Sequence, residues 1–134
     1  MNSAAGTPRA IVAAHGDLAA GLVSAVERIT GRGSALLAMS NVGLAADEME
    51  TAMRDRIAGG IRAIFTDLPS GSWTLAARRA MRGGEDVVLV TGVNLAGLLE
   101  FVMRDDLAPA AGARACIERA RGAISVIGGG ARAS

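Results

Sequence analysis

Short apolar runs alternate along this chain with longer segments in which apolar residues recur at helical spacing. This alternation is the sequence form of repeated βα units, whose strands pair into a mostly parallel sheet. We therefore predict an α/β fold: a doubly wound, four-stranded, mostly parallel sheet with helices on both faces. The strands are expected over residues 9–14, 34–39, 62–66 and 86–91.

Five segments between and after these runs have the pattern of amphipathic helices. The second shows it most clearly, because Asp47 and Glu48 lie in its first turn and Arg54 and Arg56 near its end, the order that complements a helix dipole. The third should begin near Ser72 and end before Gly83-Gly84. The expected ranges are 17–30, 45–58, 72–82, 94–104 and 110–121.

The length and composition indicate one domain over residues 1–134 with a core over about 9–127. The core must be aliphatic, because the chain has only three aromatic residues. The formal net charge is +1, so the sequence lacks the excess of basic residues expected of a nucleic-acid-binding protein. Cys116 is the only cysteine, so no intramolecular disulfide can form, and this fits a reducing cytoplasm. Residues 1–9 lack the apolar region of an export signal, so we expect a cytoplasmic protein with no direct membrane insertion.

The last apolar run, Ala123–Ile127, is too short for a helix and is predicted to be an edge strand. Glycines flank it on both sides and can act as hinges. Proteins cover or pair an apolar edge strand, because an unpaired one promotes aggregation. The segment could return to the sheet of its own chain or pair across a homodimer, and we favour the homodimer. Residues 128–134 should form a mobile tail.

His15, the only histidine, ends the first predicted strand, and Asp67 ends the third. If the chain reverses direction at the topological switch point, these strands are neighbours and the two side chains face each other. A carboxylate that accepts from one ring nitrogen leaves the other free as a nucleophile. Taken alone, His15 could instead be structural, and Asp67 could be a turn or helix-capping carboxylate.

The turn after Asp67 has the composition of an anion cradle. Ser70-Gly71-Ser72 offers flexibility, a hydroxyl and the N–H groups of the following helix, and Gly16 lies at the other helix start. We predict phosphate contacts at Ser72, Gly71 and Gly16, although Ser72 could simply cap its helix. Trp73 is either an exposed docking aromatic or packs on a second subunit. Arg78 and Arg79 are either a docking surface or a solvated helix face.

At these residues the chain resembles the IIA component of the mannose/fructose/sorbose-type bacterial sugar phosphotransferase system, over about residues 9–127. Three segments carry the resemblance: the apolar strand that runs into His15-Gly16, then Asp67 with Gly71-Ser72 and Ala76-Ala77, and Gly92-Val93-Asn94-Leu95. The resemblance implies that the phosphocarrier HPr phosphorylates His15, that Asp67 orients it and that Ser72 contacts the phosphate. It also implies a separate IIB component as acceptor, and a homodimer that exchanges its last strand.

The turn departs from the usual pattern of that family. Many members have a large residue and then Gly-Gly-Ser/Thr-Pro, whereas this chain has Leu68-Pro69-Ser70-Gly71-Ser72-Trp73. The aspartate, the second glycine and the hydroxyl are kept, so the difference concerns the part of the turn that would face a partner protein. The sugar is unreadable, because the resemblance places sugar recognition in membrane components.

Two alternatives stay open. One is a regulatory or dihydroxyacetone-kinase-linked phosphocarrier that uses the same histidine. The other is a ligand-binding α/β domain without chemistry, against which the first βα turn lacks both a Rossmann glycine fingerprint and a Walker lysine. One histidine and one distant cysteine make no metal-ligand set, and no cofactor is expected.

Overall fold

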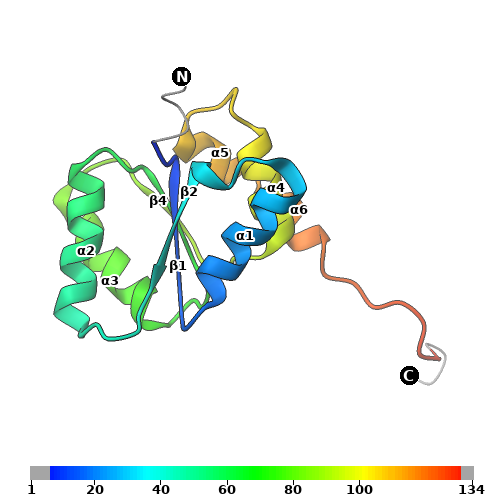
Figure 1. Cartoon of the computed structure of the whole chain (residues 1–134), viewed down its shortest axis with the longest axis horizontal. Helices are drawn as coiled ribbons and strands as arrows, with labels where there is room; N and C mark the ends of the chain where they lie inside the picture. The colour runs from blue at the N-terminus through cyan, green and yellow to red at the C-terminus, as the bar shows by residue number, and fades with distance from the viewer. Residues whose placement is uncertain (1–6, 131–134) are drawn as a thin grey trace.

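The computed structural model describes residues 7–130 and shows a parallel four-stranded sheet (Figure 1). The strands are β1 (Ala10–Ala14), β2 (Leu36–Ser40), β3 (Ala63–Thr66) and β4 (Val88–Val90), in the order β2-β1-β3-β4. The chain therefore moves outward from β1 to β2 and then returns past β1 to β3. This reversal makes β1 and β3 neighbours, as the predicted doubly wound fold requires.

Helices cover both faces of the sheet, as predicted. In Figure 1, α2 and α3 lie on one side of it, and α1, α4, α5 and α6 on the other. Two short 3-10 turns, η2 and η3, precede β2 and follow α3. The bounds are α1 Leu18–Thr30, η2 Gly33–Ala35, α2 Ala46–Ala58, α3 Ser72–Ala80, η3 Met81–Gly83, α4 Leu95–Met103, α5 Pro109–Ala115 and α6 Ile117–Gly122.

The predicted fifth helix is interrupted at Cys116. This residue has a ψ of −8°, away from the helical value, and so divides α5 from α6. Backbone hydrogen bonds run across the break, from Cys116 N–H to the Gly112 carbonyl and from Ala120 N–H to the Cys116 carbonyl. The thiol is buried, and burial raises its pKa to about 11.

The core forms two apolar layers, one on each face of the sheet. All five residues of β1 are fully buried, because this strand is covered by helices on both sides. Trp73 is also fully buried, among residues of α2 and α3 such as Met49 and Met53. The prediction of Trp73 as an exposed docking aromatic or a dimer contact is therefore wrong, because the indole fills the core of its own chain.

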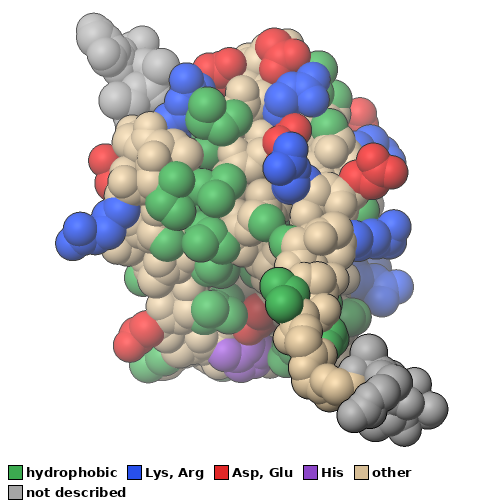
Figure 2. All heavy atoms as spheres, turned by 90° about the vertical axis from the view of Figure 1, so that its right-hand side faces the viewer, with side chains coloured by type: hydrophobic (Ala, Val, Ile, Leu, Met, Phe, Trp, Pro, Cys, Tyr) green, Lys and Arg blue, Asp and Glu red, His purple; other side chains and the backbone are tan. Residues whose placement is uncertain are grey.

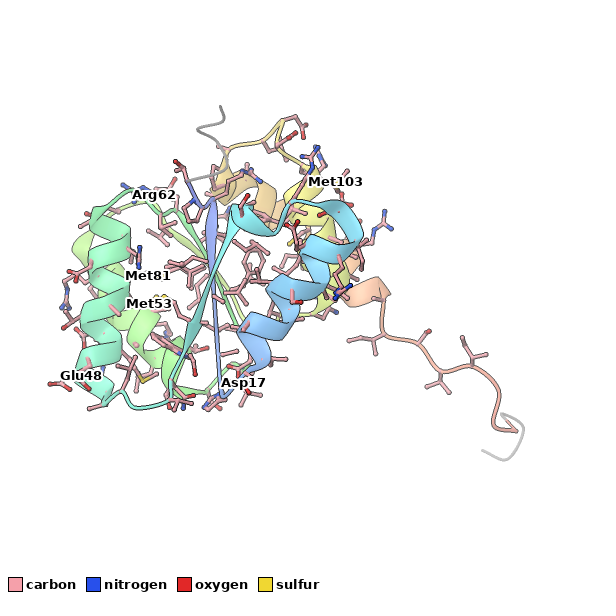
Figure 3. The ribbon with its side chains drawn as sticks, viewed as in Figure 1. Asp17, Glu48, Met53, Arg62, Met81 and Met103 are labelled. Atoms are coloured by element: carbon pink, nitrogen blue, oxygen red, sulfur yellow. The ribbon has the colours of Figure 1, made fainter. Side chains whose placement is uncertain are left out.

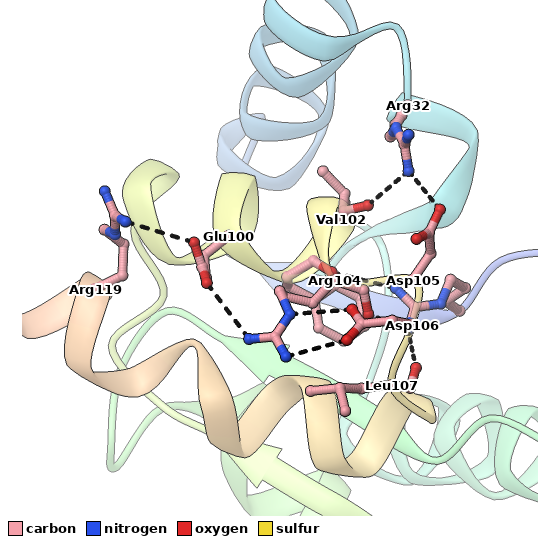
Figure 4. A network of polar contacts seen from close by, with 10 residues as sticks. Arg32, Glu100, Val102, Arg104, Asp105, Asp106, Leu107 and Arg119 are labelled. Carbon is pink, nitrogen blue, oxygen red and sulfur yellow. Dashed lines mark hydrogen bonds and ion pairs between the residues drawn. The ribbon is translucent and has the colours of Figure 1, made fainter.

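An arginine-rich network joins elements at the end of the sheet opposite the carboxyl ends of the strands (Figure 4). Arg32 bonds Asp105, and Arg104 bonds Asp106. Arg9 donates to the carbonyls of Phe101 and Leu107, at 3.2 and 2.7 Å. The bonds of Arg9 thus tie the start of β1 to the end of α4 and to the loop that follows it.

The segment Ala123–Ile127 forms no strand within this chain. It leaves α6 and extends away from the body of the molecule (Figure 1). The side chains of Ile124, Val126 and Ile127 are 80%, 93% and 94% exposed. Return of this segment to its own sheet is therefore wrong for the single chain, whereas exchange between two chains stays a prediction.

No helix within residues 7–130 is both long enough and apolar enough to cross a membrane. Two expectations fall partly outside the described residues. They are the absence of an export signal at the N-terminus, for residues 1–6, and the mobile tail, for residues 131–134.

Candidate active site

His15 and Asp67 meet at the carboxyl edge of the sheet, as the strand order predicts. Ala13 of β1 pairs with Thr66 of β3, so the next residues of both strands emerge side by side. The His15 ring nitrogen Nδ1 lies 2.8 Å from Oδ2 of Asp67. The His15 side chain is 43% exposed, against 10% for Asp67. Figure 2 shows the histidine, in purple, at the surface of the molecule. The ring is therefore held on one side and open to a partner on the other.

One carboxylate oxygen of Asp67 holds both the ring and the backbone of His15. The same Oδ2 accepts the His15 backbone N–H at 2.9 Å. Burial raises the pKa of Asp67, but the hydrogen bonds from His15 outweigh it, so this pKa lies below its ordinary value. An ionised carboxylate only accepts, so Nδ1 carries the proton and the Nε2 lone pair is free. The other oxygen, Oδ1, is buried with no hydrogen-bond partner among residues 7–130.

Gly71 gives the imidazole room. A Cβ on this residue would lie 3.2 Å from Cε1 of His15 and 3.3 Å from Cβ of Leu68. Gly71 also precedes α3, whose first residue, Ser72, is exposed. The N–H groups of the first turn of a helix have no partners within the helix, so this end of α3 offers donors to an anion near the ring.

On the expectation that His15 carries a phosphoryl group, replacement of Gly71 by alanine should slow its transfer by about tenfold or less. The added methyl group would push on the ring, whereas the backbone, at φ −79°, tolerates alanine without strain. Rates and melting temperatures of the variant and of Gly21→Ala should be compared. Gly21 is an exposed residue of α1 with open space at its Cβ, so its replacement should leave transfer unchanged. Equal rates for the two variants would contradict the close approach.

Gly16 adopts a left-handed conformation with φ +58°. Its N–H donates to the side-chain oxygen of Asn41 at 3.0 Å. The amide expected to contact phosphate is thus already paired, and the donors that remain are those at the start of α3. Asn41 follows β2 directly and was missed by the sequence analysis. The sequence pointed to Asn41 only weakly, through a single amide side chain at the end of the strand that neighbours the strand of His15.

Arg78 and Arg79 are exposed in the last turn of α3. Arg78 lies six positions after Ser72 in α3, which corresponds to about 9 Å along the helix axis. The structure therefore does not bring them to His15. Acidic residues lie nearer the site: Asp17 is the N-cap of α1 and Glu48 is in the first turn of α2, and Figure 3 shows both at this end of the sheet.

Within residues 7–130, no three His, Cys, Asp or Glu side chains lie close enough to hold a metal ion together. The site is thus a histidine, a carboxylate, a glycine that gives clearance and a helix start with a hydroxyl. Such an arrangement can hold a phosphoryl group on an imidazole.

A family model described as "PTS system fructose IIA component" matches residues 9–118. The chain belongs to this family. The match covers the whole sheet and both predicted catalytic residues, His15 and Asp67, and the family acts in phosphotransfer for sugar uptake. No curated protein matches the chain significantly.

Several solved structures have the same fold as this chain, and some of them are IIA components. The mannose/sorbose-specific IIA subunit of the phosphotransferase system from Enterococcus faecalis has 20% identity and a TM-score of 0.76, over 91% of this chain and 96% of that one. The phosphotransferase component EIIA from Streptococcus agalactiae has 19% identity and a TM-score of 0.78, over 90% and 96%. A sigma-54 interaction domain protein, also from Enterococcus faecalis, has 16% identity and a TM-score of 0.67, over 87% and 89%. At these identities the likeness is one of fold.

Proposed function

We propose that His15 accepts a phosphoryl group from HPr and passes it to a separate IIB component. The observation that supports this is the exposed imidazole whose Nδ1 lies 2.8 Å from the Asp67 carboxylate. Membership of the IIA family supports the same reaction class. The protein would act in the cytoplasm, where the phosphocarrier chain operates.

The proposed reaction has two transfers, from HPr to His15 and from His15 to IIB, and in each one bond to phosphorus forms as another breaks. The Nε2 lone pair of His15 attacks the phosphorus of the donor's phosphohistidine, and the donor's P–N bond breaks as the new one forms. The donor imidazole leaves with the electron pair and takes a proton from solvent. The Nδ1 proton of His15 stays on the ring, which becomes a cation facing Asp67. Attack on phosphorus by an acceptor on IIB then releases His15 again.

Ser72 and the first-turn N–H groups of α3 would bind the phosphoryl oxygens. They are donors near the ring that are not taken by Asp67 or Asn41. Donors placed where charge gathers favour a loose phosphoryl transition state without taking part in bond making.

Incubation with phosphoenolpyruvate, enzyme I and HPr tests the proposal. Intact mass spectrometry should show one added phosphoryl group, stable in alkali and lost in acid. Omission of HPr should prevent the gain. No phosphorylation in the complete mixture would refute the function.

A regulatory role with the same phosphohistidine is the second candidate, since the sigma-54 interaction domain protein shares the fold. A protein that accepts phosphate from HPr but transfers none to IIB would favour this role.

The protein should form a homodimer through Ala123–Ile127. This apolar segment is almost fully exposed in the single chain, and pairing in a partner's sheet would cover it. Light scattering at micromolar concentration should show a dimer, and truncation after Gly122 should lower the oligomeric state or cause aggregation. A full-length protein that is monomeric under these conditions would rule the dimer out.

A further inference from the structure

Two consecutive backbone N–H groups at the site are tied to side chains from opposite sides. Asp67, after β3, accepts the N–H of His15, and Asn41, after β2, accepts the N–H of Gly16. Because β1 lies between β2 and β3, the chain is anchored on both sides at the point where His15 leaves the sheet.

The turn at Gly16 has little else to hold it. Its φ of +58° is left-handed, and no neighbouring atom lies within 4 Å of the position that a Cβ would occupy. Packing therefore does not restrain this side of the turn. Among residues 7–130, the one other hydrogen bond across the turn runs from the Leu18 N–H to the His15 carbonyl, at 3.2 Å. Since the His15 ring is 43% exposed, its direction depends strongly on where this backbone lies.

Asn41 is itself well anchored. Its own carbonyl accepts the N–H of Leu44 at 3.1 Å. The oxygen of the amide must face Gly16, because a backbone N–H can only donate. An amide supplies this acceptor without adding a second negative charge beside a group that must receive a phosphoryl anion.

We propose that Asn41 is a positioning residue for phosphoryl transfer: its bond to Gly16 holds the turn that aims the His15 ring at Asp67. This inference rests on the proposed function for its kinetic consequence. Its structural consequence, the tautomer of His15, can be measured without any phosphoryl donor.

The test uses three variants of the full chain. Asn41→Ala removes the acceptor of the Gly16 N–H, Asn41→Asp keeps an acceptor there, and Ser40→Ala removes the neighbouring bond to the Val42 N–H and leaves the Gly16 bond in place. Nitrogen-15 NMR of His15 should show the Nδ1–H tautomer in the parent, in Asn41→Asp and in Ser40→Ala. Asn41→Ala should show a mixture of tautomers and a shifted Gly16 amide signal.

Kinetics with phosphorylated HPr should then separate positioning from binding. In Asn41→Ala we expect kcat to fall by roughly 3- to 30-fold with KM for HPr nearly unchanged, and Ser40→Ala should match the parent. The proposal is overturned by an unchanged tautomer and rate in Asn41→Ala, or by a loss that appears only in KM or only as lower thermal stability. A parent that accepts no phosphoryl group refutes the proposed function, and the tautomer measurement still decides on Asn41.

Discussion

The His15→Ala variant should take up no acid-labile phosphate from HPr. The chain contains one histidine, so loss of this side chain removes the only imidazole nucleophile. Other nucleophiles do not give this product: a phosphate on Ser72 would be an acid-stable ester, and the buried Cys116 thiol is protonated at neutral pH because burial raises its pKa to about 11. Mass spectrometry before and after acid treatment distinguishes these outcomes.

A His15→Gln variant serves as the control for shape. It keeps a polar side chain at the end of β1 and should be equally inactive, while its unfolding curve should match that of the parent. Acid-labile phosphate in either variant would show that another residue carries the phosphoryl group.

Replacement of Asp67 by asparagine should slow transfer by roughly 10- to 10³-fold. Asparagine keeps the shape but removes the charge that favours the Nδ1–H tautomer and stabilises the cationic ring after transfer. It also puts an NH₂ group where Asp67 has either the oxygen bonded to His15 or the buried, unpartnered Oδ1. Single-turnover transfer from phosphorylated HPr measures the effect directly.

Asp106→Asn is the matched control, because Asp106 is an exposed aspartate paired with Arg104 at the opposite end of the sheet. It should transfer at the parent rate. An equally unchanged rate in Asp67→Asn would show that the pair does not act in transfer.

The pKa of Asp67 lies below 3.8 in the folded protein, so the stability linked to its ionisation is present above about pH 4 and is lost as pH falls through the lowered value. The stability difference between parent and Asp67→Asn should therefore shrink in acid.

The periodicity of the sequence predicted the sheet well. Runs such as Ala10–Ala14 are apolar throughout, as a strand covered on both faces must be, and the intervening segments repeat at helical spacing. From the sequence we expected only that β1 and β3 are neighbours if the chain returns past β1, and the observed order β2-β1-β3-β4 meets this condition. The break at Cys116 was not predictable, because it depends on one ψ angle within a helical run of small residues.

The site was predicted in its central pair but not in its surroundings. His15 and Asp67 could be paired because both end neighbouring strands. Trp73 was misplaced because its position in the first turn of α3 does not reveal which side of the helix faces the sheet. Asn41 was missed because its role is a bond to a backbone N–H, which no side-chain pattern records. Ala123–Ile127 was expected to form a strand, but a strand needs a neighbour, and one chain does not supply it.

The arginine network and the histidine lie at opposite ends of the same strands, and this separation has an evolutionary consequence. The bonds of Arg9, Arg32 and Arg104 join the loops at one end, while the loops after β1, β2 and β3 meet at the other. Substitutions in the second set of loops can alter which proteins bind at the His15 end of the sheet without weakening the bonds at the first end. The scaffold can thus be inherited while the proteins that bind at its His15 end diverge.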